Sequence, residues 1–308
     1  MQIVGFKPKV PILLVTGFLG SGKTSLLKEL LISNAGKRRI AVIQNEFAQS
    51  SIDGEILKEV TTDFVIRELN TGSIFCACLF SQFKAVLKEL SSRDDIDMVV
   101  VEATGIADPI AIAQLMEDKA LSMSYYLSRI LSVVDAPRFL EVLVKISGVR
   151  HQVQVADSVI VNKVDLVDES RLEEIEAMVK QINPLANIVS CSHGAIDISR
   201  VLDGELSKPI YEQQGIKGEL TKCGEGGYIS KCYKATNMVS REGLERFMSS
   251  LSDDILRVKG YVTLTTGESV MVQYVPEQIN ITPLEGGAMS RVELVAIGFS
   301  EPDFSLLV

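Results

Sequence analysis

The segment Gly17–Thr24 combines glycines, a lysine and a hydroxyl side chain at the spacing of a phosphate-binding loop. Its sequence, Gly-Phe-Leu-Gly-Ser-Gly-Lys-Thr, matches the pattern G-x-x-x-x-G-K-[ST]. It lies between an apolar strand candidate, Ile12–Val15, and a helix candidate, Ser25–Leu31. Glycines at these positions let main-chain N–H groups converge on phosphate oxygens at the positive end of a helix dipole. We therefore predict a phosphate site formed by Gly17, Gly20, Ser21, Gly22, Lys23, Thr24 and Ser25.

An acidic residue at the end of another strand candidate predicts a metal ligand beside this loop. Glu102 follows the apolar run Val99–Val101, and Gly105 stands at the third position after it. The Thr24 hydroxyl and the Glu102 carboxylate would bind Mg²⁺, while Lys23 reaches the β- and γ-phosphates. The Gly105 amide would meet the γ-phosphate. We expect Lys23 and Glu102 to act in catalysis; the alternative for Glu102 is that it caps the next segment.

Glu46 is a second acidic candidate, because it follows the strand candidate Arg39–Ile43. At that strand end it would lie across the phosphate site from Glu102. There it would bind Mg²⁺ through water or order its loop when nucleotide is bound, so we count it with the catalytic residues. The alternative is an ordinary turn residue.

Asn162, Lys163 and Asp165 form the pattern N-K-x-D directly after the buried strand candidate Val159–Val161. The Asp165 carboxylate can accept hydrogen bonds from the ring N1–H and the exocyclic amino group of guanine, two donors that adenine does not offer. Asn162 would hold the loops together and the Lys163 stem would cover the base. We expect Cys191 to touch the guanine rim or to pack beneath it. A solvated turn is the alternative for the whole pattern.

The composition excludes several classes of protein. The chain has 308 residues, a net charge of −9 and a pI near 5.0, which argues against a nucleic-acid surface. No apolar run approaches the length of a membrane span, and the N-terminus lacks the apolar core of a signal peptide. Five cysteines without a disulfide-framework spacing predict a reducing, cytoplasmic location.

Strand and helix candidates alternate from residue 10 onward, which predicts an α/β fold with a doubly wound, mostly parallel sheet. We divide the chain into a nucleotide-binding domain at 1–207, a glycine-rich linker at 208–227 and a smaller α+β domain at 228–308. Asp135-Ala136-Pro137 predicts a helix start with Asp135 as N-cap. Strands are also expected at Phe64–Arg67, Arg129–Val134, Asn187–Ser190, Tyr228–Ala235, Ile255–Leu264, Val270–Tyr274, Ile279–Leu284 and Val292–Ile297, and helices at Phe80–Leu90, Ile110–Glu117, Ser170–Gln181 and Arg241–Leu251.

Together these motifs resemble the CobW-like family of SIMIBI-class P-loop GTPases, relatives of UreG, HypB and MeaB. The resemblance covers nearly the whole chain. It implies slow GTP hydrolysis with Mg²⁺, GTP- or GDP-dependent docking on a client protein, and metal delivery or the maturation of metal and cobalamin enzymes. It also implies pairing of two copies across the nucleotide. It rests on Gly17–Thr24, Asn45-Glu46-Phe47, Ile52-Asp53-Gly54, Glu102-x-x-Gly105, Val134-Asp135-Ala136, Asn162-x-x-Asp165, Arg257-Val258-Lys259-Gly260-Tyr261 and Val295-Ala296-Ile297-Gly298.

The chain departs from the family at its metal-binding cysteines. The family carries Gly-Cys-x-Cys-Cys, whereas from Gly72 this chain reads Gly-Ser-Ile-Phe-Cys-Ala-Cys, so that Cys76 is kept and Cys78 is an added thiol. Two thiolates with Glu46 as a third ligand would suit Zn²⁺ or another soft metal. The alternative is that Cys76 and Cys78 are small residues packed at a loop–helix junction. For Cys223 and Cys232, and for His151 and His193, packing is favoured over metal binding.

Two functions follow from these residues. The first is a Mg²⁺-dependent GTPase that acts as a metallochaperone or maturation factor for a metalloprotein. The second is a nucleotide-gated module that assembles or reactivates a cobalamin or corrinoid protein without moving metal, which the altered cysteine motif favours. An ATP-dependent small-molecule kinase is disfavoured by Asn162, Lys163 and Asp165.

Overall fold

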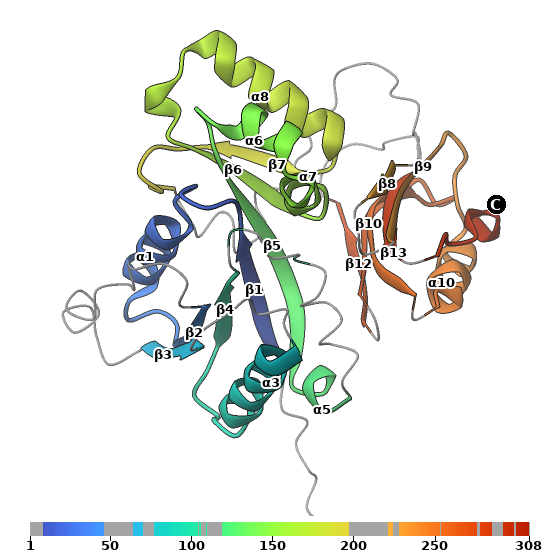
Figure 1. Cartoon of the computed structure of the whole chain (residues 1–308). Coiled ribbons are helices and arrows are strands. Elements are labelled where there is room, and N and C mark those ends of the chain that lie inside the picture. The colour runs from blue at the N-terminus through green and yellow to red at the C-terminus, as the bar shows by residue number, and fades with distance from the viewer. Residues whose placement is uncertain are drawn as a thin grey trace, which may run out of the picture. The chain divides into compact units, whose positions relative to one another are not determined.

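A computed structural model of the chain divides into two compact units, Met1–Pro209 and Ile210–Val308, which we describe separately (Figure 1). The structure describes residues 9–45, 64–69, 77–103, 105, 109, 119–196, 221–223, 228–252, 254–275, 278–284, 292–298 and 300–307. In these residues no helix is long and apolar enough to cross a bilayer.

The first unit contains a seven-stranded sheet in the order β3-β2-β4-β1-β5-β6-β7, and every neighbouring pair is parallel. The prediction of a parallel α/β sheet is therefore confirmed. Because the strands are parallel, their carboxyl ends share one edge of the sheet. The strands are β1 (Val10–Thr16), β2 (Ile40–Asn45), β3 (Phe64–Leu69), β4 (Met98–Glu102), β5 (Tyr125–Asp135), β6 (Ser158–Asn162) and β7 (Asn187–Ser190).

Both faces of this sheet are covered, as strand β6 illustrates. Ile160 packs into a cluster with α1, whereas its neighbours Val159 and Val161 pack into a second cluster with α6, α7 and α8. Alternate residues of a strand point to opposite faces, so the apolar run buries both. Figure 1 shows α6, α7 and α8 gathered beside β6 and β7. The helices are α1 (Lys23–Asn34), α3 (Ala77–Ser91), α5 (Lys119–Ser122), α6 (Phe139–Lys145), α7 (Ser147–Gln154) and α8 (Glu169–Ile182), with a 3₁₀ turn η1 (Val164–Leu166).

Two predictions at the end of β5 were wrong or incomplete. Asp135 is not a helix N-cap: β5 continues through it, and α6 begins only at Phe139 with Arg138 at the N-cap position. The adjacent helices α6 and α7 were not predicted, although apolar residues recur in them at helical spacing. The helix predicted at 110–117 lies outside the described residues.

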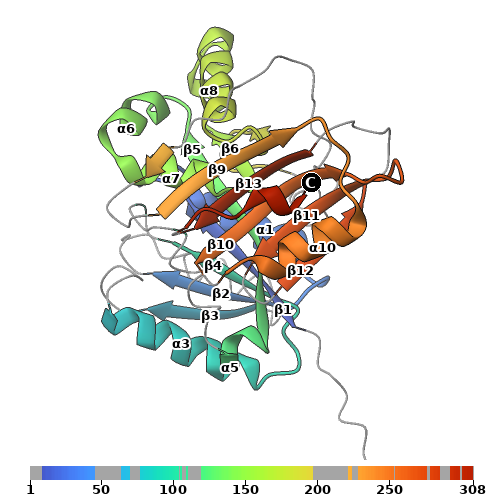
Figure 2. The same cartoon turned by 90° about the vertical axis from the view of Figure 1, so that its right-hand side faces the viewer.

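The second unit contains a six-stranded antiparallel sheet in the order β12-β11-β10-β13-β9-β8. Helix α10 (Arg241–Ser250) and the 3₁₀ turn η2 (Phe304–Leu307) lie on one face of it (Figure 2). The predicted α+β class is confirmed for this unit. Its strands are β8 (Thr221–Cys223), β9 (Tyr228–Ala235), β10 (Ile255–Thr263), β11 (Ser269–Val275), β12 (Gln278–Pro283) and β13 (Val292–Gly298). Strand β8 falls inside the range that we expected to be linker.

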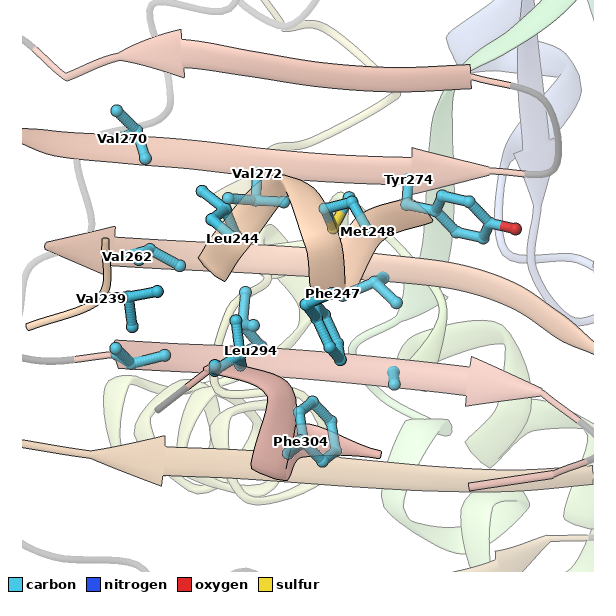
Figure 3. Packing of buried hydrophobic residues seen from close by; sticks show 14 of the residues in the cluster. Val239, Leu244, Phe247, Met248, Val262, Val270, Val272, Tyr274, Leu294 and Phe304 are labelled. Atoms are coloured by element: carbon cyan, nitrogen blue, oxygen red, sulfur yellow. The ribbon is translucent and has the colours of Figure 1, made fainter. Parts of the chain in front are cut away.

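Helix α10 forms the core of the second unit against alternate residues of the sheet. Ser240 caps the helix, because its hydroxyl accepts a hydrogen bond from the Gly243 N–H at 3.0 Å. Phe247 from α10 stacks on Phe304 of η2 with ring centroids 5.4 Å apart (Figure 3). Apolar residues of β9, β10, β11, β12 and β13 pack in one cluster with this helix, so the unit buries its own core.

Candidate nucleotide-binding site

The phosphate loop joins β1 to α1, as predicted, and two of its glycines cannot be replaced without collision. Gly22 has φ 97°, and a Cβ there would lie 2.2 Å from Asn162 Nδ2. A Cβ on Gly17 would lie 2.2 Å from the Val133 carbonyl oxygen. Gly22 is also the N-cap of α1 and supplies no side-chain cap. The first N–H groups of α1 are therefore available to an anion.

Lys23 lies inside the loop with its ammonium group on main-chain carbonyls. Its Nζ donates to the Gly17 carbonyl at 2.9 Å and to the Phe18 carbonyl at 3.2 Å, and the residue is only 8% exposed. Burial lowers the pKa of Lys23, and the nearby Glu102 carboxylate partly offsets this shift. A buried cation held by neutral carbonyls would gain from a phosphate group beside it.

Thr24 and Glu102 meet although they are far apart in the sequence. The Thr24 hydroxyl donates to Glu102 Oε1 at 2.8 Å, and Gln44 Nε2 donates to Glu102 Oε2 at 2.7 Å. Strand β4 lies between β1 and β2, which brings its terminal carboxylate beside the start of α1. A hydroxyl and a carboxylate are the oxygen donors that Mg²⁺ prefers, so these residues fit the predicted ion.

Asn162 connects the phosphate loop to the two loops that follow β6 and β7. Its Nδ2 donates to the Ser21 carbonyl at 2.9 Å. Its Oδ1 accepts from the Lys163 N–H at 2.9 Å and the Gly194 N–H at 3.1 Å. The Asn162 side chain is 2% exposed and makes its hydrogen bonds inside the protein, so it connects these loops to one another.

Lys163 makes a second connection across the same edge. It adopts the left-handed backbone conformation, with φ 63°. Its Nζ donates to the Gly20 carbonyl at 2.7 Å and to Asp135 Oδ2 at 2.9 Å. The pair Lys163–Asp135 therefore ties the ends of β5 and β6 to the phosphate loop.

Asp165 lies on the exposed turn η1 that follows, where its carboxylate faces solvent. A hydrogen bond from the Ser192 side chain lowers the pKa of Asp165, so the group stays ionised. An exposed, ionised carboxylate held by Ser192 has the chemistry needed to accept two N–H donors of guanine.

Gly105 packs against the phosphate loop. A Cβ on Gly105 would lie 2.5 Å from the Leu19 main-chain nitrogen, so only glycine permits this approach. Gln152 of α7 donates from Nε2 to the Gly105 carbonyl at 3.2 Å. Gly105, which we predicted to meet the γ-phosphate, thus contacts the phosphate loop at Leu19, next to the Gly20 carbonyl that Lys163 contacts.

Comparison with protein families agrees with this geometry. Residues 11–190 match the model of the CobW/HypB/UreG nucleotide-binding domain, and residues 228–305 match the cobalamin synthesis protein CobW C-terminal domain. The chain belongs to the CobW family of P-loop GTPases. Among solved structures, Zn(II)-bound YjiA GTPase from Escherichia coli shares the fold, with a TM-score of 0.60, 23% identity and 97% of each chain covered.

Curated CobW-family relatives are similar over part of their length. The zinc-regulated GTPase metalloprotein activator 1 of Schizosaccharomyces pombe is 34% identical over 63% of this chain and 49% of its own. The zinc chaperone YjiA of Escherichia coli is 33% identical over 61% of this chain and 59% of its own. The match therefore spans about half to three fifths of these two relatives.

Several predicted site residues of this CobW-family chain are not placed. Glu46 and Cys76 lie outside the described residues, and Cys78 belongs to α3 with its side chain outside them. In the part of the chain that the structure describes, no group of three or more His, Cys, Asp or Glu side chains has the geometry of a metal site. The transition-metal site formed by Cys76, Cys78 and Glu46 therefore stays a prediction.

Cys191, Ser21 and Ser25 are placed at the nucleotide edge. The Cys191 thiol is buried in the core beneath Asn162 and donates to Asn162 Oδ1 at 3.5 Å; burial raises its pKa to about 11. The Cys191 side chain therefore packs in the core and contacts Asn162, and it does not face solvent. Ser21 Oγ is buried with no hydrogen-bond partner among the described residues, and Ser25 is exposed on the first turn of α1.

We predicted no role in the site for four of its residues, and assigned Asp135 among them to a helix start: Gln44, Asp135, Gln152 and Ser192. Three of them stand at or just after strand ends, where polar residues following an apolar run were a usable signal. Gln152 had no such signal, because it stands in a helix that was not predicted and reaches Gly105 only through the tertiary fold.

Proposed function

We propose that this chain is a Mg²⁺-dependent GTPase that acts as a metallochaperone or maturation factor for a client metalloprotein in the cytoplasm. The observation that carries the proposal is the 2.8 Å contact between Thr24 and Glu102, which brings the two predicted Mg²⁺ ligands together beside the phosphate loop. The names of the relatives, a zinc-regulated GTPase metalloprotein activator and a zinc chaperone, support zinc as the metal.

Each residue then has a defined part in GTP hydrolysis. Lys23 would leave its carbonyl partners and contact the β- and γ-phosphate oxygens, where it stabilises the charge that develops on them. Thr24 and Glu102 would hold Mg²⁺, which when bound neutralises phosphate charge. Glu102 and Glu46 would orient the attacking water, and Gly105 would donate its N–H to the γ-phosphate.

The base is selected at the other end of the site. The ionised Asp165 carboxylate would accept the N1–H and amino hydrogens of guanine. Asn162 and Lys163 would hold that turn at a fixed position relative to the phosphate loop through their hydrogen bonds to the Ser21 and Gly20 carbonyls. The residues that would bind the base and those that would bind the phosphates are thereby attached to the same loop. This arrangement favours the binding of GTP or GDP over nucleotides with other bases.

Phosphate release from GTP, followed as a function of Mg²⁺ concentration, tests the GTPase proposal. In Glu102→Gln the rate should fall about 10- to 100-fold and half-maximal activity should need more Mg²⁺. Asp157→Asn is the control, because Asp157 is a buried acid just before β6, at the other end of that strand from Asn162, and accepts from the Ile130 N–H at 2.8 Å. Hydrolysis that needs no Mg²⁺, or that tolerates Glu102→Gln, would contradict the proposal.

The metal part of the proposal places Zn²⁺ on Cys76, Cys78 and Glu46. Anaerobic titration of Zn²⁺ into the reduced protein, first with Mg²⁺-GTP and then with Mg²⁺-GDP, should give about one tightly bound ion whose affinity differs between the two states. Cys76→Ser should abolish it, because two ligands cannot hold zinc tightly. Cys223→Ser is the matched control and should bind as the wild type does. Nucleotide-independent binding would contradict a GTP-controlled delivery.

A second candidate is a nucleotide-gated module that assembles or reactivates a cobalamin or corrinoid protein. The observation that favours it is the replacement of two family cysteines by Ser73 and Phe75. No zinc binding in either nucleotide state, together with a GTP-dependent complex with a corrinoid protein, would establish this candidate. For either function we propose a nucleotide-dependent homodimer, which sedimentation with and without a GTP analogue would detect.

A further inference from the structure

Gly105 is held between two elements that come from distant parts of the chain. On one side its Cα packs so closely on Leu19 that an added Cβ would lie 2.6 Å from Leu19 Cγ. On the other side its carbonyl accepts a hydrogen bond from Gln152 Nε2 at 3.2 Å. Gly105 is thus held by the phosphate loop and by α7.

Of these two neighbours, α7 is the rigid one. Asn183 Nδ2 donates to the carbonyls of Val153, Gln154 and Ala156 at 2.9, 3.0 and 2.9 Å, which fastens the end of α7 to the residue that follows α8. Gln152 itself is 1% exposed, so its amide cannot turn to water.

The phosphate-loop side of the contact is less constrained. Leu19 is 51% exposed, and it lines a cavity together with Phe18 and Phe139. The Leu19 side chain is therefore only partly enclosed, whereas the Gln152 side chain is buried. The buried hydrogen bond from α7 therefore helps to set the position of Gly105 independently of the Leu19 side chain.

We propose that Gln152 is a positioning residue that holds Gly105 at the γ-phosphate end of the phosphate loop and thereby sets the preference for GTP over GDP. The inference rests on the proposed function. GDP lacks the phosphate that the Gly105 N–H would contact, so a pre-positioned Gly105 strengthens the binding of GTP alone. Without the Gln152 bond, Gly105 would have to be positioned when GTP binds, and this would lower the affinity for GTP.

The experiment measures the affinities of the full chain for Mg²⁺-GDP and for a non-hydrolysable Mg²⁺-GTP analogue. Gln152→Met keeps the length of the side chain and removes the donor. The affinity for the GTP analogue should fall about fivefold, the factor that corresponds to one neutral hydrogen bond, and GDP affinity should stay as it is. Gln152→Asn, whose amide is one methylene too short to reach Gly105, should give the same selective loss and serves if the first variant does not fold.

Asn34→Leu is the matched control, since Asn34 is also buried and donates from Nδ2 to a main-chain carbonyl, that of Leu30, at 2.8 Å. It should lower the melting temperature without changing the ratio of the two affinities. An unchanged ratio in both Gln152 variants, or a ratio that shifts toward GTP, would overturn the inference. A wild-type protein that binds neither nucleotide would instead refute the proposed function, so the two failures are distinguishable.

Discussion

The phosphate end and the base end of the candidate site are built in different ways. At the phosphate end the charged groups are buried: Lys23 is 8% exposed and Glu102 is 9% exposed. At the base end Asp165 is exposed on a turn, and the buried residue is the neutral Asn162. Both ends belong to one edge of one parallel sheet, so the difference lies in the side chains and not in the fold.

This difference indicates how each end gains from its ligand. At the phosphate end a buried ammonium group rests on carbonyls, and its lowered pKa reflects the cost of burying it. An incoming phosphate would supply the missing counter-charge. At the base end the hydrogen bonds of Asn162, Lys163 and Ser192 are already made within the protein. We therefore expect substitutions at the phosphate end to affect hydrolysis most, and those at the base end to affect selectivity.

The largest effect is expected from Lys23→Met. Loss of the ammonium should reduce the rate of GTP hydrolysis about 10²- to 10³-fold, the size typical of a lost electrostatic contact to a transition state. Because burial disfavours the charged form of Lys23, the melting temperature of the nucleotide-free protein should not fall. Lys28→Met, on the same helix, is the control. If Lys23→Met hydrolysed GTP at the wild-type rate, the Lys23 ammonium would not stabilise the transition state.

Asp165→Asn should have the next largest effect, on selectivity rather than on hydrolysis. Replacing a charged acceptor by an amide should lower GTP affinity about 10- to 100-fold. The amide offers a donor to the carbonyl that xanthine carries in place of the guanine amino group, so affinity for xanthosine triphosphate should rise. Asp168→Asn, at the N-cap of α8, should leave both affinities unchanged. Competition binding measures all of them, and an unchanged preference for GTP in Asp165→Asn would contradict guanine recognition there.

The smallest effect is expected from Ser192→Ala. The Ser192 hydrogen bond lowers the pKa of Asp165, so the carboxylate and the binding of guanine persist as the pH falls. Without the hydroxyl that pKa moves up toward its ordinary value, and GDP affinity should begin to fall at a higher pH. Titrations from about pH 7 to about pH 4 measure this. Ser190→Ala, which removes a hydroxyl that contacts Glu176, should keep the wild-type profile.

The strands of the first unit were predictable because buried parallel strands are short, continuous apolar runs, such as Val159–Val161. The motifs at their carboxyl ends then had to share one edge, which is why we expected Thr24, Glu102 and Asn162 to lie near one another; in the structure Thr24 contacts Glu102, and Asn162 contacts the phosphate loop at Ser21. Asp135 was assigned to a helix start because Asp-Ala-Pro fits a cap. The extension of β5 through Asp135, with its ion pair to Lys163, prevailed over that local preference.

Contacts between distant segments were not predictable in the same way. Gln44 and Gln152 are ordinary polar residues in the sequence, and their roles depend on partners 58 and 47 positions away. Such pairs follow from strand order and helix packing, which a single sequence does not encode locally. Metal binding by Cys76, Cys78 and Glu46 stays a prediction, because the side chains of these residues lie outside the described part of the structure.

The most direct test of the account is a calorimetric titration of the wild-type chain with Mg²⁺-GTP, Mg²⁺-GDP and Mg²⁺-ATP. If Asp165 recognises guanine and Lys23 recognises phosphate at one site, GTP and GDP should each bind once per chain. ATP should then bind at least about 100-fold more weakly, the factor that the loss of hydrogen bonds to a charged group allows. Equal affinity for ATP and GTP would contradict the account, because the phosphate end alone would then determine binding.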